Sequence, residues 1–282
     1  MPAADVFKSF FENPGRILAN IIWRFPKTVS YTPHIFVVGA PRSGTTLLQS
    51  ILCVHPQVTG LDEETGFFML RDIFSLKFDE LDPHEISMAQ NSSRDIVQYF
   101  DMLASIITNN DPSVRFLEKT PQHVLQLDFI SKHFPNAQVV HVVRDGRDCY
   151  CSAKDHRGVV QGQSVEKYAN YWKRCIQARI NCNSRNIIDV RYEDFTSNPE
   201  REISRIMGFL GLEVAPHQLD PRYYSKNRMS QKSEFQKLNS EITSSSNKRW
   251  LADMSEKEQS KFVEISSPEL TAFNYEIGSR GD

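Results

Sequence analysis

The sequence predicts an α/β protein built on a parallel sheet. Apolar, β-branched segments at 34–38 and 138–143 are typical of strands buried on both faces of a sheet, and 115–119 and 186–192 also predict strands. Each is followed by a polar or glycine-containing turn and then by apolar residues at helical spacing. With 282 residues, 40% hydrophobic and 24% charged, the chain fits one large globular domain.

The segment 34–48 organises the rest of the chain. A strand, a turn bracketed by Gly39 and Gly44, and hydroxyl residues that open a helix follow in that order. In such a loop backbone N–H groups converge, the helix N-terminus adds positive potential, and glycine lets an anion approach. The spacing is that of a nucleoside-triphosphate loop, but Thr45 replaces the expected lysine and Arg42 lies within the loop. We therefore expect a phosphate-binding cradle.

Composition excludes several classes of protein. With 33 basic and 35 acidic residues the net charge is −2, which argues against general nucleic-acid binding, although a local basic cleft stays open. No apolar run approaches the roughly 20 residues of a membrane span, and the N-terminus lacks the plan of a signal peptide, so we expect a cytoplasmic protein without an integral membrane segment. The five cysteines lack metal-site spacing, and we expect neither a metal site nor a disulfide framework.

The N-terminal part, residues 1–33, predicts two short amphipathic helices separated at Pro14 and Gly15. We expect this extension to pack on the main domain, 34–282, rather than on a membrane, because few lysines flank its apolar face. The helix after the phosphate loop should run to about Val54, before a His-Pro pair.

An acidic pair, Glu63 and Glu64, precedes two phenylalanines. These carboxylates either cap the next helix or act in the site, and both readings stay open. Residues 69–113 predict helices, with an apolar stripe between Ile96 and Ile107 that could line a substrate pocket.

Charged residues follow two of the predicted strands. Lys119 ends the strand at 115–119, and ligands of open α/β sheets collect at the carboxyl ends of strands. The strand at 138–143 is followed by Arg144 to Asp148. This turn either binds an anion or is a polar turn whose aspartates cap the next helix while its arginines lie in solvent.

The C-terminal half predicts mainly structural elements. A long helix at about 164–184 has aromatic residues at helical spacing, and another helix begins at Asn198 and ends at Gly211. The polar stretch 216–248 predicts a solvated loop, although its basic residues could close over an anion. A last helix is expected near 255–265.

Together these features resemble the sulfotransferases, in particular the branch that contains the protein-tyrosine sulfotransferases and the bacterial and algal enzymes sharing their pattern. The resemblance covers about residues 34–255. The motifs that carry it are Pro41–Leu48, His55–Pro56, Glu64–Thr65, Lys119, Val143–Arg147 and Ser152. The Pro41–Leu48 and Val143–Arg147 motifs are specific for this family in combination, and neither is specific alone.

The resemblance implies a P-loop-like, three-layer α/β fold that binds 3′-phosphoadenosine 5′-phosphosulfate (PAPS). Its sulfuryl group would pass to a hydroxyl or amine acceptor and leave 3′-phosphoadenosine 5′-phosphate (PAP). The loop would hold the 5′-phosphosulfate, an arginine and a serine the 3′-phosphate, and a loosely matched C-terminal basic pair would close over the nucleotide. The implied donor-binding residues are Pro41, Arg42, Ser43, Gly44, Thr45, Thr46, Arg144, Ser152, Lys248 and Arg249.

The chemistry of sulfuryl transfer agrees with these residues. An in-line, loose transition state needs positioning and charge stabilisation, which the side-chain cations Arg42 and Lys119 can supply in place of Mg²⁺. An acceptor hydroxyl also needs a base, and the tyrosine-sulfating enzymes use a glutamate in a Glu-Glu-Thr context. An ungapped count from the loop selects Glu63, whereas the Glu-Thr pair selects Glu64, which we favour. His123 is a further candidate base, as in the small-molecule enzymes.

The acceptor and two alternative functions stay open. We expect neither the N-terminal membrane helix nor the disulfides of the tyrosine-sulfating enzymes, and Gly66 stands where they have an arginine. We therefore expect the acceptor to be the hydroxyl of a sugar, lipid or small metabolite at least as readily as that of a peptide. The spacing of Gly39 and Gly44 also fits a P-loop kinase or nucleotide hydrolase, although the lysine and a clear magnesium-binding aspartate are missing. A non-catalytic nucleotide-binding protein is a third reading.

Overall fold

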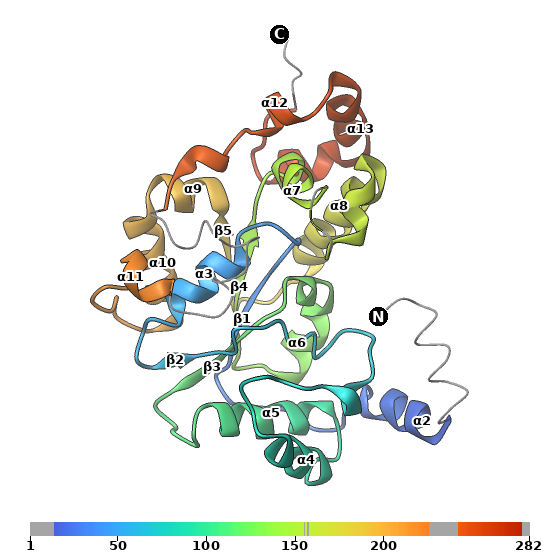
Figure 1. The fold of residues 1–282 in the computed structure, drawn as a ribbon, viewed down its shortest axis with the longest axis vertical. Coiled ribbons are helices and arrows are strands. Elements are labelled where there is room, and N and C mark those ends of the chain that lie inside the picture. Colours follow the sequence, from blue (N-terminus) through green and yellow to red (C-terminus); the bar gives the residue numbers. More distant parts are fainter. Residues whose placement is uncertain (1–13, 155, 157, 226–241, 278–282) are drawn as a thin grey trace.

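A five-stranded parallel sheet forms the centre of the molecule (Figure 1). The computed structural model describes residues 14–154, 156, 158–225 and 242–277. The strand order is β2-β3-β1-β4-β5, and each pairing in this part of the chain is parallel, which confirms the predicted mainly parallel sheet. The strands are β1 (Ile35–Gly39), β2 (Val58–Thr59), β3 (Arg115–Lys119), β4 (Gln138–Val143) and β5 (Ile187–Arg191).

The central strand β1 pairs with β3 on one side and with β4 on the other. Val37 lies opposite Lys119 of β3 and Val140 of β4, so the carboxyl ends of these three strands meet at one edge of the sheet. The short strand β2 was not predicted, because two residues carry no alternating pattern.

Helices cover both faces of the sheet, with α3, α9 and α10 on the left and α6 and α8 on the right of Figure 1. The helices are α2 (Pro14–Trp23), α3 (Thr45–Leu52), α4 (Pro83–Asn91), α5 (Ile96–Ile107), α6 (Leu127–His133), α7 (Gly146–Ala153), α8 (Val165–Asn181), α9 (Tyr192–Ser197), α10 (Pro199–Leu210), α11 (Pro221–Tyr224), α12 (Trp250–Asp253) and α13 (Glu256–Ala272). Short 3₁₀ turns are η1 (Ile73–Ser75), η2 (Pro121–Gln126), η3 (Val160–Gln163) and η6 (Ser244–Ser246).

Alternate residues of β1 enter two different cores. Phe36 and Val38 pack with apolar residues of α5, α6 and α8, whereas Ile35 and Val37 pack with α3 and α10. Because side chains alternate along a strand, one buried strand supplies both layers. This arrangement confirms the three-layer α/β fold.

Most predicted helices are present with shifted ends. α3 stops at Leu52 rather than Val54, and α10 has the predicted cap, since Asn198 accepts from the N–H of Arg201. α13 continues past 265 to Ala272, because the non-helical backbone at Ser266 kinks the helix instead of ending it. No helix of the described residues could span a membrane.

Two predictions fall wholly or partly outside the described residues. The first of the two N-terminal helices was expected within 1–13, and the second is α2. Of the expected loop at 216–248, residues 226–241 are not described, and the part before them contains the short helix α11, whose Tyr224 is buried. A solvated loop was therefore wrong for 221–224.

Candidate functional site

The phosphate loop packs so closely that two of its positions require glycine. A Cβ atom at Gly39 would lie 2.4 Å from the carbonyl oxygen of Val142, and one at Gly44 would lie 2.5 Å from the ring of Tyr192. Gly44 also has a φ of 102°, which glycine adopts without strain. Arg42 has a positive φ of 71°, and α3 begins directly after the loop. The loop is therefore a tight turn that leads directly into the N-terminus of α3, as the sequence predicted.

Two hydrogen bonds hold the backbone of the loop in place. The hydroxyl of Tyr168 on α8 donates to the carbonyl of Pro41, and the N–H of Ser43 donates to that of Ala40 at 3.1 Å. Ser43 is completely buried, and its Oγ has no hydrogen-bond partner among the described residues. A buried hydroxyl without a partner is costly, which marks the loop as a place where a polar ligand would be stabilised.

Three residues predicted from distant segments meet beside the loop. Arg42 Nε donates to Ser152 Oγ on α7 at 3.1 Å, and Arg144 Nη1 donates to the carbonyl of Arg42 at 3.3 Å. The Arg144 guanidinium stacks over Tyr192, 4.4 Å from the ring centroid, and its Nε has no partner in the described part of the chain. Arg42 of the loop thus lies with a second arginine and a hydroxyl, a set suited to an anion with several oxygens.

At the end of β3, Lys119 and Glu64 form an ion pair. Lys119 Nζ lies 3.1 Å from Glu64 Oε1, and the lysine side chain is buried while 40% of the glutamate side chain is exposed. The cation is therefore held within the protein and the carboxylate remains accessible. Glu63 has a different role, since its Oε1 accepts from the backbone N–H of Asp79 at 2.9 Å.

His123 is held in the core by both ring nitrogens. Its Nε2 accepts from the N–H of Phe68 at 3.1 Å, so its Nδ1 carries the proton and donates to Glu118 Oε2 at 2.7 Å. No ring nitrogen is left to take a proton from a substrate.

Glu118, which no sequence motif singled out, anchors the loop that carries Glu64. Burial alone would raise its pKa, but His123, Thr120 and Thr65 outweigh burial and lower the pKa of this carboxyl. Thr65, directly after Glu64, donates to Glu118 Oε1 at 2.8 Å. The only signal in the sequence was an acidic residue inside an otherwise buried strand.

A C-terminal segment, residues 246–250, lies on Arg144, and we call it the strap. The carbonyl of Ser246 accepts from Arg144 Nη2 at 2.7 Å. Asp148 on α7 accepts the N–H groups of Lys248 and Trp250 at 2.8 and 2.9 Å. Burial raises the pKa of Asp148 to about 6. The strap is thus tied to the turn after β4 through its backbone.

The basic side chains of the strap form ion pairs with carboxylates. Lys248 Nζ lies 3.2 Å from Glu276 Oε1, and Arg249 Nη2 lies 2.6 Å from Asp253 Oδ2. The structure therefore brings the backbone of the strap to the predicted site, whereas its two cations form ion pairs with these acids.

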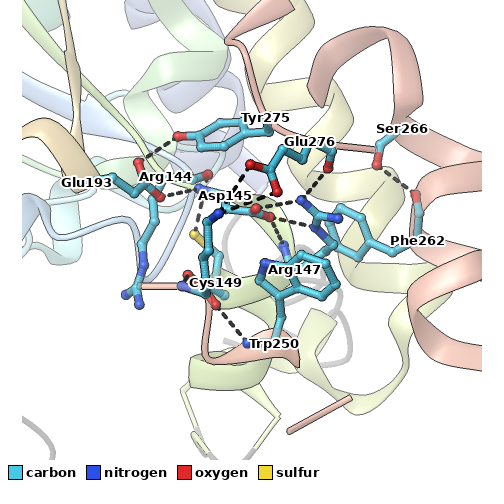
Figure 2. Close-up of polar contacts among 12 residues, drawn as sticks. Arg144, Asp145, Arg147, Cys149, Glu193, Trp250, Phe262, Ser266, Tyr275 and Glu276 are labelled. Atoms are coloured by element: carbon cyan, nitrogen blue, oxygen red, sulfur yellow. Dashed lines mark hydrogen bonds and ion pairs between the residues drawn. The ribbon is translucent and has the colours of Figure 1, made fainter. Parts of the chain in front are cut away.

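Beside Trp250 of the strap, Asp145 and Arg147 form the centre of a buried polar cluster (Figure 2). Asp145 accepts from the N–H, Nε and Nη2 of Arg147, and Arg147 stacks 3.7 Å from the ring centroid of Trp250. The Arg144 guanidinium extends away from this cluster in Figure 2. Arg144 and Arg147 are only 6% and 1% exposed, so the reading in which these arginines lie in solvent is wrong, while the capping role of Asp145 is confirmed.

The described residues contain no group of three or more His, Cys, Asp or Glu that could hold a metal ion. The five cysteines are free thiols.

The chain matches the model of the sulfotransferase family over residues 33–216. It is 26% identical over 195 residues to protein-tyrosine sulfotransferase 1 of Danio rerio, covering 64% of this chain and 53% of that protein. It is also 26% identical over 204 residues to protein-tyrosine sulfotransferase 2 of Gallus gallus, covering 68% of this chain and 54% of that protein. The chain thus spans about half the length of the curated relatives it matches.

Solved structures share the fold at low sequence identity. The sulfotransferase domain of the Synechococcus PCC 7002 olefin synthase has a TM-score of 0.66 and 19% identity, covering 90% of this chain and 98% of that domain. A mouse sulfotransferase complexed with PAP has a TM-score of 0.51 and 16% identity, covering 86% of each chain.

Proposed function

Because the chain belongs to the sulfotransferase family, we propose that it transfers a sulfuryl group from PAPS to a hydroxyl or amine acceptor. The observation that carries this proposal is the pair of buried Lys119 and accessible Glu64, at the same sheet edge as the phosphate loop. A fixed cation beside an exposed carboxylate, next to an anion cradle, supplies the two things that sulfuryl transfer needs: charge stabilisation and a base.

The residues of the cradle fit the donor. Gly39 and Gly44 allow close approach of the backbone, and the N-terminus of α3 favours negative charge. The buried Ser43 Oγ and Arg144 Nε lack partners among the described residues and can take up phosphate or sulfate oxygens. Arg144 and Ser152 would hold the 3′-phosphate, and a mouse protein of this fold is complexed with PAP.

In the proposed reaction, Glu64 takes the proton of the acceptor hydroxyl. The acceptor oxygen then forms a bond to sulfur, and the bond between sulfur and the bridging oxygen of the 5′-phosphate breaks, leaving PAP and the sulfated acceptor. Arg42 and Lys119 stabilise the negative charge that develops on the sulfuryl and bridging oxygens. Because these cations are fixed in the protein, the reaction needs no bound metal ion.

We assign the base to Glu64 rather than to the two other candidates. Glu63 accepts a backbone N–H and so holds a loop together, and both nitrogens of His123 are engaged in the core. The acceptor group belongs to a sugar, a lipid, a small metabolite or a peptide.

Calorimetric titration with PAP tests the donor. We expect the wild type to bind PAP without added metal, and the surface variant Arg201→Ala, whose side chain is 64% exposed, to bind equally well. Absence of binding by the folded wild type, or Mg²⁺-dependent turnover of ATP in its place, would contradict the proposal in favour of a kinase or hydrolase.

A further inference from the structure

Helix α2 presents an apolar face to solvent. Leu18, Ile21, Ile22 and Phe25 are 59%, 45%, 58% and 77% exposed, and they recur at the spacing of one helical face, which continues into the turn after the helix. A stripe of this kind normally faces the core of a protein. Large exposed apolar patches mark sites of interaction.

The opposite face of α2 contacts the domain largely through polar groups. Arg16 Nε lies 2.8 Å from Asp72 Oδ2, and Asn20 Nδ2 donates to Asp72 Oδ1 at 2.8 Å. Trp23 anchors the helix through an aromatic contact, with its ring centroid 4.8 Å from that of Phe74. The orientation of the helix is thus fixed by specific contacts, and its apolar stripe is held outward.

Basic residues lie at the edge of this stripe. Arg24 Nη2 donates to the carbonyl of Arg71 at 2.6 Å, and the exposed Lys27 follows on the same segment. Burial and the nearby charge of Arg71 lower the pKa of Arg24, while Asp72 acts in the opposite direction. Two guanidinium groups close enough for one to lower the pKa of the other are a favourable place for an anion.

A cavity of about 210 Å³ adjoins the same patch. Its walls are Arg24, Phe68, Leu70, Ile96, Gln126 and Phe129. Arg24 belongs to the basic edge, and Leu70 is 88% exposed, so both connect the cavity to the surface. The mostly apolar lining suits a hydrocarbon segment.

We propose that Leu18, Ile21, Ile22, Phe25 and Leu70, with Arg24 and Arg71 at their edge, form a surface that binds an anionic phospholipid bilayer. The helix lies in the plane of the bilayer, its apolar side chains enter the boundary between headgroups and acyl chains, and the guanidinium groups contact lipid phosphates. The sequence predicted packing on the domain rather than on a membrane, because few lysines flank the helix, but the fold adds Arg71 from a distant segment beside Arg24 at the edge of the apolar face. The proposal is independent of sulfuryl transfer.

Co-sedimentation of the full chain with vesicles tests this surface. We expect the chain to bind vesicles of phosphatidylcholine and phosphatidylglycerol at least about tenfold more tightly than vesicles of phosphatidylcholine alone, with binding weakened by salt. The double variant Ile22→Glu/Phe25→Glu should lose binding. Ile180→Glu, which changes a 48% exposed apolar residue on α8, should keep it.

A second variant separates charge from apolar contact. Arg24→Gln should weaken binding to the anionic vesicles by about fivefold and leave binding to neutral vesicles unchanged. Circular dichroism and PAP affinity establish that each variant is folded. Equal binding to both vesicle types, no binding to either, or retention of binding by folded Ile22→Glu/Phe25→Glu would overturn the proposal. So would a dimer in light scattering that the same double variant abolishes.

Discussion

The carboxyl ends of β3 and β4 hold charged residues in two different ways. At the end of β3, Lys119 makes one hydrogen bond in the described part of the chain, to the partly exposed Glu64. At the end of β4, Arg144 contacts the loop, the strap and Tyr192, and Asp148 accepts two backbone N–H groups. At the β3 end, Glu64 is thus partly exposed and held by one contact, whereas Arg144 and Asp148 at the β4 end are buried and held by several contacts.

We infer different tasks for the two ends from this difference. A carboxylate that acts as a base must reach the acceptor, and the Glu64 side chain is 40% exposed and forms one ion pair, to Lys119, among the described residues. A group that binds the same part of a donor in every cycle gains from a rigid setting, because less entropy is lost on binding. We therefore expect substitutions at the β3 end to affect turnover, and those at the β4 end to affect donor affinity or stability.

The largest effect is expected for Lys119→Met. Removal of the cation should lower kcat by about a thousandfold, because it removes a preorganised charge from the transition state. The fold should persist, since the remaining Glu64 is solvated and bears no buried, unpaired charge. Turnover and the melting temperature would be measured beside Lys132→Met, an exposed lysine on α6. Loss of PAP affinity with unchanged kcat would contradict the division of tasks.

The two glutamates give a matched pair. Glu64→Gln should lower kcat by several hundredfold, roughly the contribution of a general base, and keep PAP affinity. Glu63→Gln should retain activity, because its amide oxygen can still accept the N–H of Asp79. Steady-state rates and calorimetry measure both. An active Glu64→Gln together with an inactive Glu63→Gln would move the base to Glu63.

At the β4 end, Asp148 gives stability a pH dependence. Its pKa of about 6, raised by burial from 3.8, means that the folded state binds the proton more tightly than the unfolded chain. Its contribution to stability is therefore greatest at low pH, falls as the pH rises to about 6, and is constant above. Between pH values of about 4 and 6 the wild type should lose about 3 kcal/mol of unfolding free energy relative to Asp148→Asn. Denaturant titrations at several pH values measure the unfolding free energies of both proteins. If the two unfolding free energies change with pH in parallel, the role of Asp148 is refuted.

Arg144→Ala should weaken PAP binding by about thirtyfold, as expected when charge-assisted hydrogen bonds to a phosphate are lost. Arg144→Lys should lie between this variant and the wild type, because it keeps the charge and loses the planar fork. Calorimetry measures the affinities, and kcat at saturating donor should change little. A variant that binds PAP normally would remove Arg144 from the donor site.

The sequence predicted the sheet better than the contacts at its edge. Apolar, β-branched residues determine β1 and β4 locally, and glycine spacing with a strand before it and a helix after it determines the phosphate loop. β2 was not predicted because two residues carry no alternating pattern. α13 continues beyond its predicted end because the backbone at Ser266 kinks the helix without ending it.

The contacts within the site depend on tertiary packing that no local pattern contains. Glu64 and Lys119 are 55 residues apart, and only the pairing of β3 with β1 brings the lysine to the loop. The sequence left Glu63 and Glu64 as alternatives, and the structure separates them by their partners, Asp79 and Lys119. The outward apolar face of α2 was also not predictable, because an amphipathic pattern does not say which face meets the protein.

The most direct test of sulfuryl transfer and of the role of Glu64 measures transfer of radiolabelled sulfate from PAPS to pooled sugar, lipid, small-metabolite and peptide acceptors, with wild type and Glu64→Gln side by side. We predict a labelled acceptor with the wild type in the absence of added metal, and a loss of several hundredfold with a Glu64→Gln variant that still binds PAP. Equal transfer by the two proteins would contradict the role of Glu64. A wild type that binds PAP and labels no acceptor would contradict sulfuryl transfer itself.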